Sequence, residues 1–203
     1  SDPDGDEAAE FGLALAAESR EREAQERFRH QHARRRDGTR IELLINVAGA
    51  EELEHISPAA CDGIGLMRSE FLFRDGAPLP DEETQYRAYR RFVEWAGGKP
   101  VTIRTLDIGG DKPVRGLTPE GEANPFLGLR GVRLTLVRED VFRTQLRALA
   151  RVSVHGPLKV MLPMVTVPEE LSRSAALLDE CIAELEGQGI ACKRPPLGIM
   201  VEV

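Results

Sequence analysis

The sequence predicts an α/β fold built around a parallel sheet. After residue 38, short apolar runs alternate with segments whose apolar residues recur at the helical period. Several of these runs are continuously apolar, as strands covered on both faces are. Alternating strands and helices are typical of a parallel sheet whose helices form the crossovers. We therefore expect residues 39–203 to form one α/β unit and residues 1–38 to be a charged helical linker.

The first expected element is a long helix over residues 7–36. This segment is rich in Glu, Ala, Arg and Gln, and it contains one glycine and no proline. Its apolar residues become sparse after Leu15, and a helix with such a weak apolar face is typical of a connection between domains. The basic residues 34–36 fall near its end, where cations complement the helix dipole. The turn signal Asp37-Gly38 separates this helix from the α/β unit.

The α/β unit is expected to contain five strands with helices between them. The strands are predicted at residues 41–47, 63–67, 101–106, 158–165 and 197–203. Apolar stripes that begin at Tyr86, Phe142 and Leu171 mark three helices. About 50 residues separate the third strand from the fourth, more than one helix and short connections require. This segment contains GGDKPVRG and GEANPFLG, which suit a shaped loop that binds a ligand.

Composition and charge exclude several classes of partner. The formal net charge of -7 argues against nucleic acid and against an anionic membrane surface. No apolar run approaches the roughly 20 residues that span a bilayer. The three cysteines, Cys61, Cys181 and Cys192, fit neither a disulfide framework nor a metal site, so we expect a cytoplasmic protein. Because the first residue is Ser1, we expect a piece of a longer protein.

Three arginines stand where an apolar run gives way to polar residues or glycine: Arg68, Arg104 and Arg130. Parallel sheets gather their working residues at the carboxyl ends of strands. A guanidinium presents a rigid fork of donors that matches phosphates and carboxylates. Each arginine alone could instead form a salt bridge at the sheet edge. Three at similar places, beside a glycine-rich loop, favour a site for a small, highly charged anion.

Two further features point to the same site. The turn Gly109-Gly110-Asp111-Lys112 offers backbone N–H groups and an ammonium, although it lacks the spacing of a P-loop. Glu202 is an acid in an expected apolar strand, where a carboxylate must be paired, bound to a cation or protonated. It could pair with an arginine of a neighbouring strand. It could instead be a ligand of Mg²⁺, which one or two carboxylates commonly hold together with substrate oxygens.

Five motifs, GIGLMRSEFLF, RTLDIGGDK, NPFLGLRGVR, MLPM and GIMVEV, occur in an order that resembles a known family. They are similar to the phosphoenolpyruvate-binding domain of the enzyme I family, the phosphoenolpyruvate-protein phosphotransferases of bacterial sugar and nitrogen phosphotransferase systems. The resemblance covers residues 41–203. It implies a (β/α)₈ TIM barrel, of which this chain supplies about five of eight strands, preceded by the linker from an absent phosphohistidine domain.

The resemblance also implies roles for individual residues. It implies that five residues bind phosphoenolpyruvate: Arg68, Arg104, Arg130, Lys112 and Asn124. It implies that Glu202 is one of two acidic Mg²⁺ ligands, with Mg²⁺ as the cofactor. No catalytic residue is expected in this chain. The second metal ligand, the cysteine that protonates the enolate and the histidine that receives the phosphoryl group are all expected outside it.

The implied function is the first step of the phosphotransferase system, which serves sugar transport. Phosphoenolpyruvate phosphorylates a histidine of the enzyme, which passes the group to an HPr-like phosphocarrier protein, and the intact enzyme is expected to be a cytoplasmic homodimer. Two alternatives remain: the homologous barrel of pyruvate phosphate dikinase or phosphoenolpyruvate synthase, and a noncatalytic module that senses phosphoenolpyruvate. The wording RSEFLF and the charged helix favour enzyme I. We expect this polypeptide alone to be inactive and to bind phosphoenolpyruvate weakly or not at all.

Overall fold

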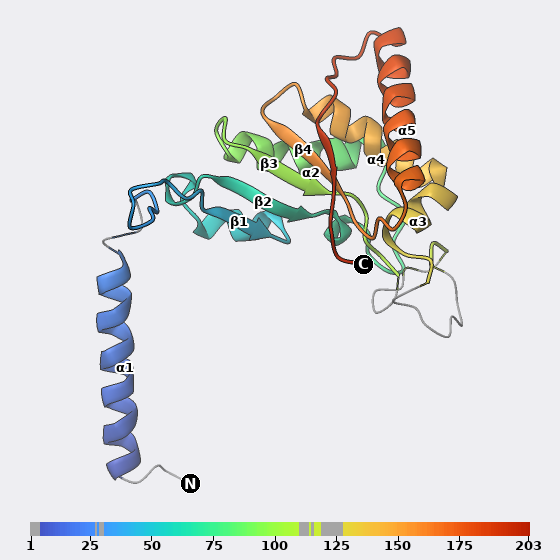
Figure 1. The fold of residues 1–203 in the computed structure, drawn as a ribbon. Helices are drawn as coiled ribbons and strands as arrows, with labels where there is room; N and C mark the ends of the chain where they lie inside the picture. Colours follow the sequence, from blue (N-terminus) through green and yellow to red (C-terminus); the bar gives the residue numbers. More distant parts are fainter. Residues whose placement is uncertain (1–4, 27, 29–30, 110–113, 115, 119–127) are drawn as a thin grey trace.

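The fold is an α/β arrangement around a five-stranded parallel sheet, seen in a computed structural model (Figure 1). The structure describes residues 5–26, 28, 31–109, 114, 116–118 and 128–203. The strands are β1 (Leu44–Val47), β2 (Gly63–Arg68), β3 (Val101–Arg104), β4 (Leu158–Leu162) and β5 (Leu197–Ile199). Each strand pairs in parallel with the next along the chain. The predicted α/β class with a parallel sheet and all five predicted strands are therefore confirmed, while the barrel stays a prediction.

The helices of the α/β unit cover one face of this sheet. They are α2 (Glu82–Trp95), α3 (Gly131–Val137), α4 (Glu139–Val152) and α5 (Pro168–Gly187), with the 3₁₀ turns η1 (Ala50–His55), η2 (Pro58–Ala60) and η3 (Ser69–Leu72). The strand order follows the chain, so right-handed crossovers place successive helices on the same side. Helix α4 packs between α2 and α5. In the described part of the chain the sheet is open, with β1 and β5 as its edges.

The core lies between the helices and the face of the sheet that they cover. Ile64 and Ile103 of β2 and β3 are fully buried against Phe92 of α2 and Leu149 of α4. A second cluster joins β4 and α4 to α5 through residues that include Leu162 and Leu178. Side chains on the other face are more open, and Lys159 of β4 is exposed. The apolar stripes predicted for the helices thus mark the faces that pack on the sheet.

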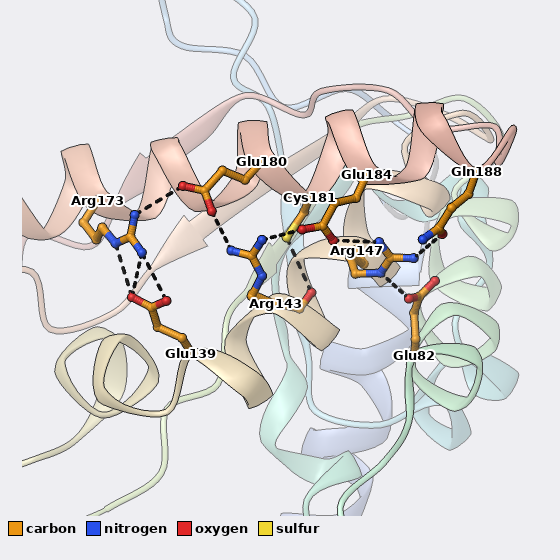
Figure 2. Close-up of polar contacts among 9 residues, drawn as sticks. All are labelled: Glu82, Glu139, Arg143, Arg147, Arg173, Glu180, Cys181, Glu184 and Gln188. Carbon is orange, nitrogen blue, oxygen red and sulfur yellow. Dashed lines mark hydrogen bonds and ion pairs between the residues drawn. The ribbon is translucent and has the colours of Figure 1, made fainter.

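Ion pairs hold α4 against its two neighbouring helices (Figure 2). Arg143 of α4 reaches Glu180 at 2.6 Å and Glu184 at 2.5 Å, both on α5. Arg147 reaches Glu184 at 3.2 Å and, on the other side, Glu82 of α2 at 2.6 Å. Hydrogen bonds from Arg143 hold the pKa of Glu180 and of Glu184 below the usual range for a carboxyl group. The network therefore links the three helices electrostatically.

The N-terminal helix is shorter than predicted. Helix α1 (Gly5–Glu26) extends away from the sheet in Figure 1, and residues 33–41 form a hairpin instead of continuing the helix. An antiparallel bridge joins Arg34 to Arg40. Gly38 has φ of 85°, and the Asp37 carboxylate accepts a hydrogen bond from Thr39 N at 2.9 Å. The turn chemistry of Asp37-Gly38 therefore places the basic residues 34–36 in a hairpin, and the prediction of a helix to residue 36 was wrong.

The long connection between β3 and β4 also differs in detail from the prediction. It contains α3 in addition to the predicted α4. The α3 sequence, GVRLTLV, is rich in apolar and β-branched residues, which gave no clear helical pattern. All five strands also differ from the predicted bounds at one end, and β5 stops at Ile199 rather than Val203. Among the described residues, no helix combines the length and the apolar character needed to cross a membrane.

Candidate functional site

Two of the predicted arginines are neighbours at the carboxyl ends of adjacent strands. Arg68 is the last residue of β2, Arg104 is the last residue of β3, and the two are register partners. Arg68 is exposed and makes no ion pair with any residue in the described part of the chain. It lines a pocket of about 320 Å³ together with Glu70, Phe73 and Asp75. The parallel register therefore places Arg68 and Arg104 side by side at the carboxyl end of the sheet.

Arg104 belongs to a buried ion-pair network. Its side chain is 8% exposed; one terminal nitrogen pairs with Glu70, and Nη1 lies 3.0 Å from Asp107 Oδ2. Asp107 also accepts hydrogen bonds from Arg130, with Nη2 3.1 Å from Oδ1. The sulfur of Met200, just beyond β5, lies 3.8 Å from Arg104 Nη1. Arg104 and Arg130 thus form the ion pairs that the salt-bridge alternative describes, and two carboxylates balance their two positive charges; binding of an anion by either arginine stays a prediction.

The network leaves donor capacity on Arg104. Its Nε is buried and, within the residues that the structure describes, has no hydrogen-bond acceptor. A buried donor without a partner costs free energy, on the order of 1–3 kcal/mol. The carboxylates Glu70 and Asp107 fix the plane of the guanidinium, while Arg68 beside it remains exposed.

Arg130 reaches the site from a helix rather than from a strand. It is the N-cap residue of α3, whereas Arg68 and Arg104 are the last residues of strands. Two glycines allow its approach. A Cβ on Gly109 would lie 2.7 Å from Arg130 Cβ, and a Cβ on Gly131, whose φ is 55°, would lie 2.9 Å from Met164 Cγ. The close packing of this loop therefore requires glycine at both positions.

Glu202 lies beyond the end of β5 and is exposed, which corrects the prediction that it sits within an apolar strand. Its Oε1 accepts a hydrogen bond from Met164 N at 2.8 Å, and no arginine in the described ranges pairs with it. Met164 follows β4 and has φ of 58°, a left-handed conformation that is uncommon for a residue other than glycine. Strained backbone of this kind concentrates at functional sites, and here it aims an N–H at the carboxylate.

The remaining predicted ligands have different outcomes. Lys112 and Asn124 lie outside the described residues. Within the described residues there is no group of three or more His, Cys, Asp or Glu side chains that could hold a metal ion. Mg²⁺ needs only one or two carboxylates when substrate oxygens and water complete its shell. The exposed carboxylate of Glu202 is chemically suited to be one such ligand.

A buried glutamine, which the sequence analysis missed, connects the two strand ends. Gln145 of α4 is fully buried, and its Oε1 accepts a hydrogen bond from Leu106 N at 2.9 Å. Its Nε2 donates to Ser69 Oγ at 3.1 Å and to Tyr89 Oη at 2.8 Å. Burial raises the pKa of Tyr89 above its usual value, so this hydroxyl stays neutral. The side-chain amide of Gln145 therefore makes hydrogen bonds to three separate segments of the chain.

These hydrogen bonds position the arginine pair. Ser69 directly follows Arg68, and Leu106 lies between Arg104 and Asp107. One side chain on α4 thus fixes the segments that leave β2 and β3. In the sequence, the one sign of this role is that Gln145 is a polar residue within the apolar stripe of a predicted helix.

Comparison with known proteins identifies the family. The family model described as "PEP-utilising enzyme, PEP-binding domain" matches residues 22–203. A phosphoenolpyruvate-protein phosphotransferase of Enterococcus faecalis is 37% identical over 205 residues, which cover 100% of this chain and 36% of that protein. Proteins of the same name from Priestia megaterium and Staphylococcus aureus are 43% and 44% identical over 168 residues, which cover 82% of this chain and 29% of each relative.

The chain spans about a third of the length of these curated relatives. The matched domain includes the whole sheet and both strand ends that carry Arg68 and Arg104. This chain therefore belongs to the family of PEP-utilising enzymes, which it matches through their PEP-binding domain.

Proposed function

We propose that this chain is the phosphoenolpyruvate-binding part of a phosphoenolpyruvate-protein phosphotransferase. That enzyme would transfer the phosphoryl group of phosphoenolpyruvate to one of its own histidines and then to a phosphocarrier protein. The observation that carries the proposal is the pairing of Arg68 with Arg104 at the carboxyl ends of β2 and β3, beside an open pocket. The shared name of the relatives supports this reaction over that of a dikinase or a synthase.

The sheet would be part of a (β/α)₈ barrel in the intact protein. Its strand order and its helices on one face support this, because both are features of such barrels. Residues 39–203 would then be a partial barrel, and residues 1–38 the linker from a phosphohistidine domain. Edge strands with unpaired backbone groups favour non-native association. The isolated chain should therefore bind phosphoenolpyruvate weakly or not at all and should have no transferase activity.

The arginines would hold the phosphoryl group. Arg68 is exposed at the pocket and would supply an uncompensated positive charge, and Arg104 would supply its remaining N–H groups from a fixed orientation. Phosphoryl transfer depends chiefly on positioning and charge neutralisation, which such an arrangement provides. Arg130, Lys112 and Asn124 are proposed as further contacts.

A metal ion would complete the charge balance. Glu202 would be one ligand of Mg²⁺, together with an acid outside this chain. When bound, the ion would neutralise negative charge on the phosphoryl oxygens and on the departing enolate of pyruvate. The chain's own contribution is to hold the Glu202 carboxylate next to β4 through Met164 N. We further propose that the intact enzyme is a cytoplasmic homodimer that phosphorylates an HPr-like carrier.

A phosphoryl-transfer assay on the intact protein tests this function. With phosphoenolpyruvate and Mg²⁺, we expect a phosphohistidine on the enzyme, pyruvate as product, and onward transfer to a carrier protein without any nucleotide. A strict requirement for a nucleotide would assign the protein to the dikinase type instead. Binding of phosphoenolpyruvate with no pyruvate formed would indicate a sensing module.

A further inference from the structure

A second pocket lies at the opposite end of the strands from the arginine pair. It has a volume of about 230 Å³ and is formed where the chain enters β4 and β5. Its lining residues are Ser153, Gly156, Pro157, Leu158, Lys159, Lys193, Arg194, Pro195 and Pro196. Arg68 and Arg104 close their strands at the carboxyl ends, whereas these residues precede or open theirs. The pocket is therefore separate from the proposed phosphoenolpyruvate site.

The lining of this amino-end pocket has one sign of charge. It contains three cationic side chains and no acidic one, although the whole chain carries a net charge of -7. Arg194 is partly neutralised, because its Nε lies 2.6 Å from Asp179 Oδ1. Lys159 and Lys193 are exposed, and neither forms an ion pair within the described part of the chain. Two ammonium groups therefore remain available to an anion.

The walls between these lysines are apolar and held in place. Leu158 is 3% exposed, and three prolines complete the lining. The carbonyl of Pro157 accepts a hydrogen bond from Val101 N at 3.0 Å, and that of Pro196 accepts one from Val160 N at 2.9 Å. Proline fixes its own backbone φ, so little conformational freedom remains to be lost when a ligand binds. The pocket is formed before any ligand arrives.

We propose that the amino-end pocket binds a small organic phosphate. The phosphate dianion would lie between Lys159 and Lys193, and the organic group would lie against Leu158 and the prolines. Lysine binds phosphate as a point charge and does not need the planar geometry that arginine requires. Pockets for drug-sized ligands are larger, roughly 300–1,000 Å³, so the ligand is smaller than a nucleotide. Such a ligand would bind without displacing phosphoenolpyruvate.

Calorimetric titration of the full chain with phenyl phosphate tests this assignment. Phenyl phosphate combines a dianion with an apolar group, inorganic phosphate has only the charge, and phenol has only the ring. We expect saturable binding of phenyl phosphate, weaker binding of inorganic phosphate and no binding of phenol. In the double variant Lys159→Gln/Lys193→Gln the affinity should fall at least about tenfold, because a hydrogen bond to a charged group contributes about 1.5–3 kcal/mol.

Two single variants show whether a loss of affinity is specific to this pocket. Arg91→Gln removes one exposed charge from α2 and should leave the affinity for phenyl phosphate unchanged. Arg68→Gln should leave it unchanged as well, which would also distinguish this binding from the proposed phosphoenolpyruvate site. The assignment is overturned if the double variant binds as the unaltered chain does, or if Arg68→Gln abolishes binding. Equal affinity for inorganic and phenyl phosphate would refute the role of the apolar wall.

Discussion

Replacing Gln145 with leucine should destabilise the protein strongly. The side chain is fully buried and joins α4 to Leu106 N, Ser69 Oγ and Tyr89 Oη at distances from 2.8 to 3.1 Å. Leucine has a similar volume but no polar atoms. The Gln145→Leu variant would therefore leave the three partner groups buried without this hydrogen-bonding side chain.

The expected loss of stability can be estimated from these partners. A buried polar group left without its hydrogen bond costs about 1–3 kcal/mol. Leu106 N loses an acceptor and Ser69 Oγ loses a donor, whereas Tyr89 Oη keeps its bond to Gln85 Oε1 at 3.0 Å. The free energy of unfolding should therefore fall by about 2–6 kcal/mol, a large part of the ~5–15 kcal/mol of a typical domain.

Urea unfolding followed by circular dichroism measures this change. Gln25→Leu is the matched control, because Gln25 is an exposed glutamine within helix α1. Exposed substitutions usually change the free energy by no more than about 0.5 kcal/mol. A loss below about 1 kcal/mol for Gln145→Leu would refute the claim that this side chain holds the two strand ends together.

Three further outcomes are expected. Hydrogen bonds from Arg143 lower the pKa of Glu180 and of Glu184 from the usual 4.5, so the stabilisation from these ion pairs is complete above pH 4.5 and is lost as the pH falls through the lowered pKa values. Melting curves recorded across this pH range should show a falling melting temperature, and a constant melting temperature would contradict the prediction. Arg143→Gln should flatten this acid dependence and make the melting temperature less sensitive to salt. When the folded protein is labelled with a thiol reagent, half-buried Cys192 should react well before Cys181, because burial raises the pKa of Cys181 to about 11. Mass spectrometry would show the order of labelling, and equal rates for the two cysteines would contradict the prediction.

The sheet could be predicted from the sequence because its strands are short apolar runs between well-marked helices. The position of Arg68 beside Arg104 followed from the general rule that the carboxyl ends of parallel strands lie at the same end of the sheet. Helix α3 could not be predicted, since its β-branched and apolar residues are equally compatible with a strand and it is held by packing around Gly131. Local pattern alone does not contain that tertiary contact.

The partners of the site residues were likewise beyond the sequence. Nothing in the order of residues shows that Asp107 binds two arginines or that Gln145 joins three elements, because these contacts depend on how α3 and α4 cross the sheet. The predicted end of the long N-terminal helix was wrong for a local reason. Its sequence retains helix-forming residues up to the turn at Gly38, and the hairpin of residues 33–41 wins through that turn.

The structure also changes which arginine is best suited to a binding experiment. Removing one partner of a buried ion pair typically costs about 3–5 kcal/mol, so a substitution of Arg104 would confuse unfolding with loss of binding. Arg68 is exposed and makes no ion pair in the described ranges, so it can be changed with little effect on folding.

Titration of the intact protein with phosphoenolpyruvate in the presence of Mg²⁺ therefore tests the central claim most directly. If the strand-end arginines hold the phosphoryl group, Arg68→Gln should weaken binding at least about tenfold while Arg91→Gln has no effect, because one charged hydrogen bond contributes about 1.5–3 kcal/mol. Equal affinities for phosphoenolpyruvate in the unaltered protein and in Arg68→Gln, measured by calorimetry, would contradict the assignment of this sheet edge as the phosphoenolpyruvate site.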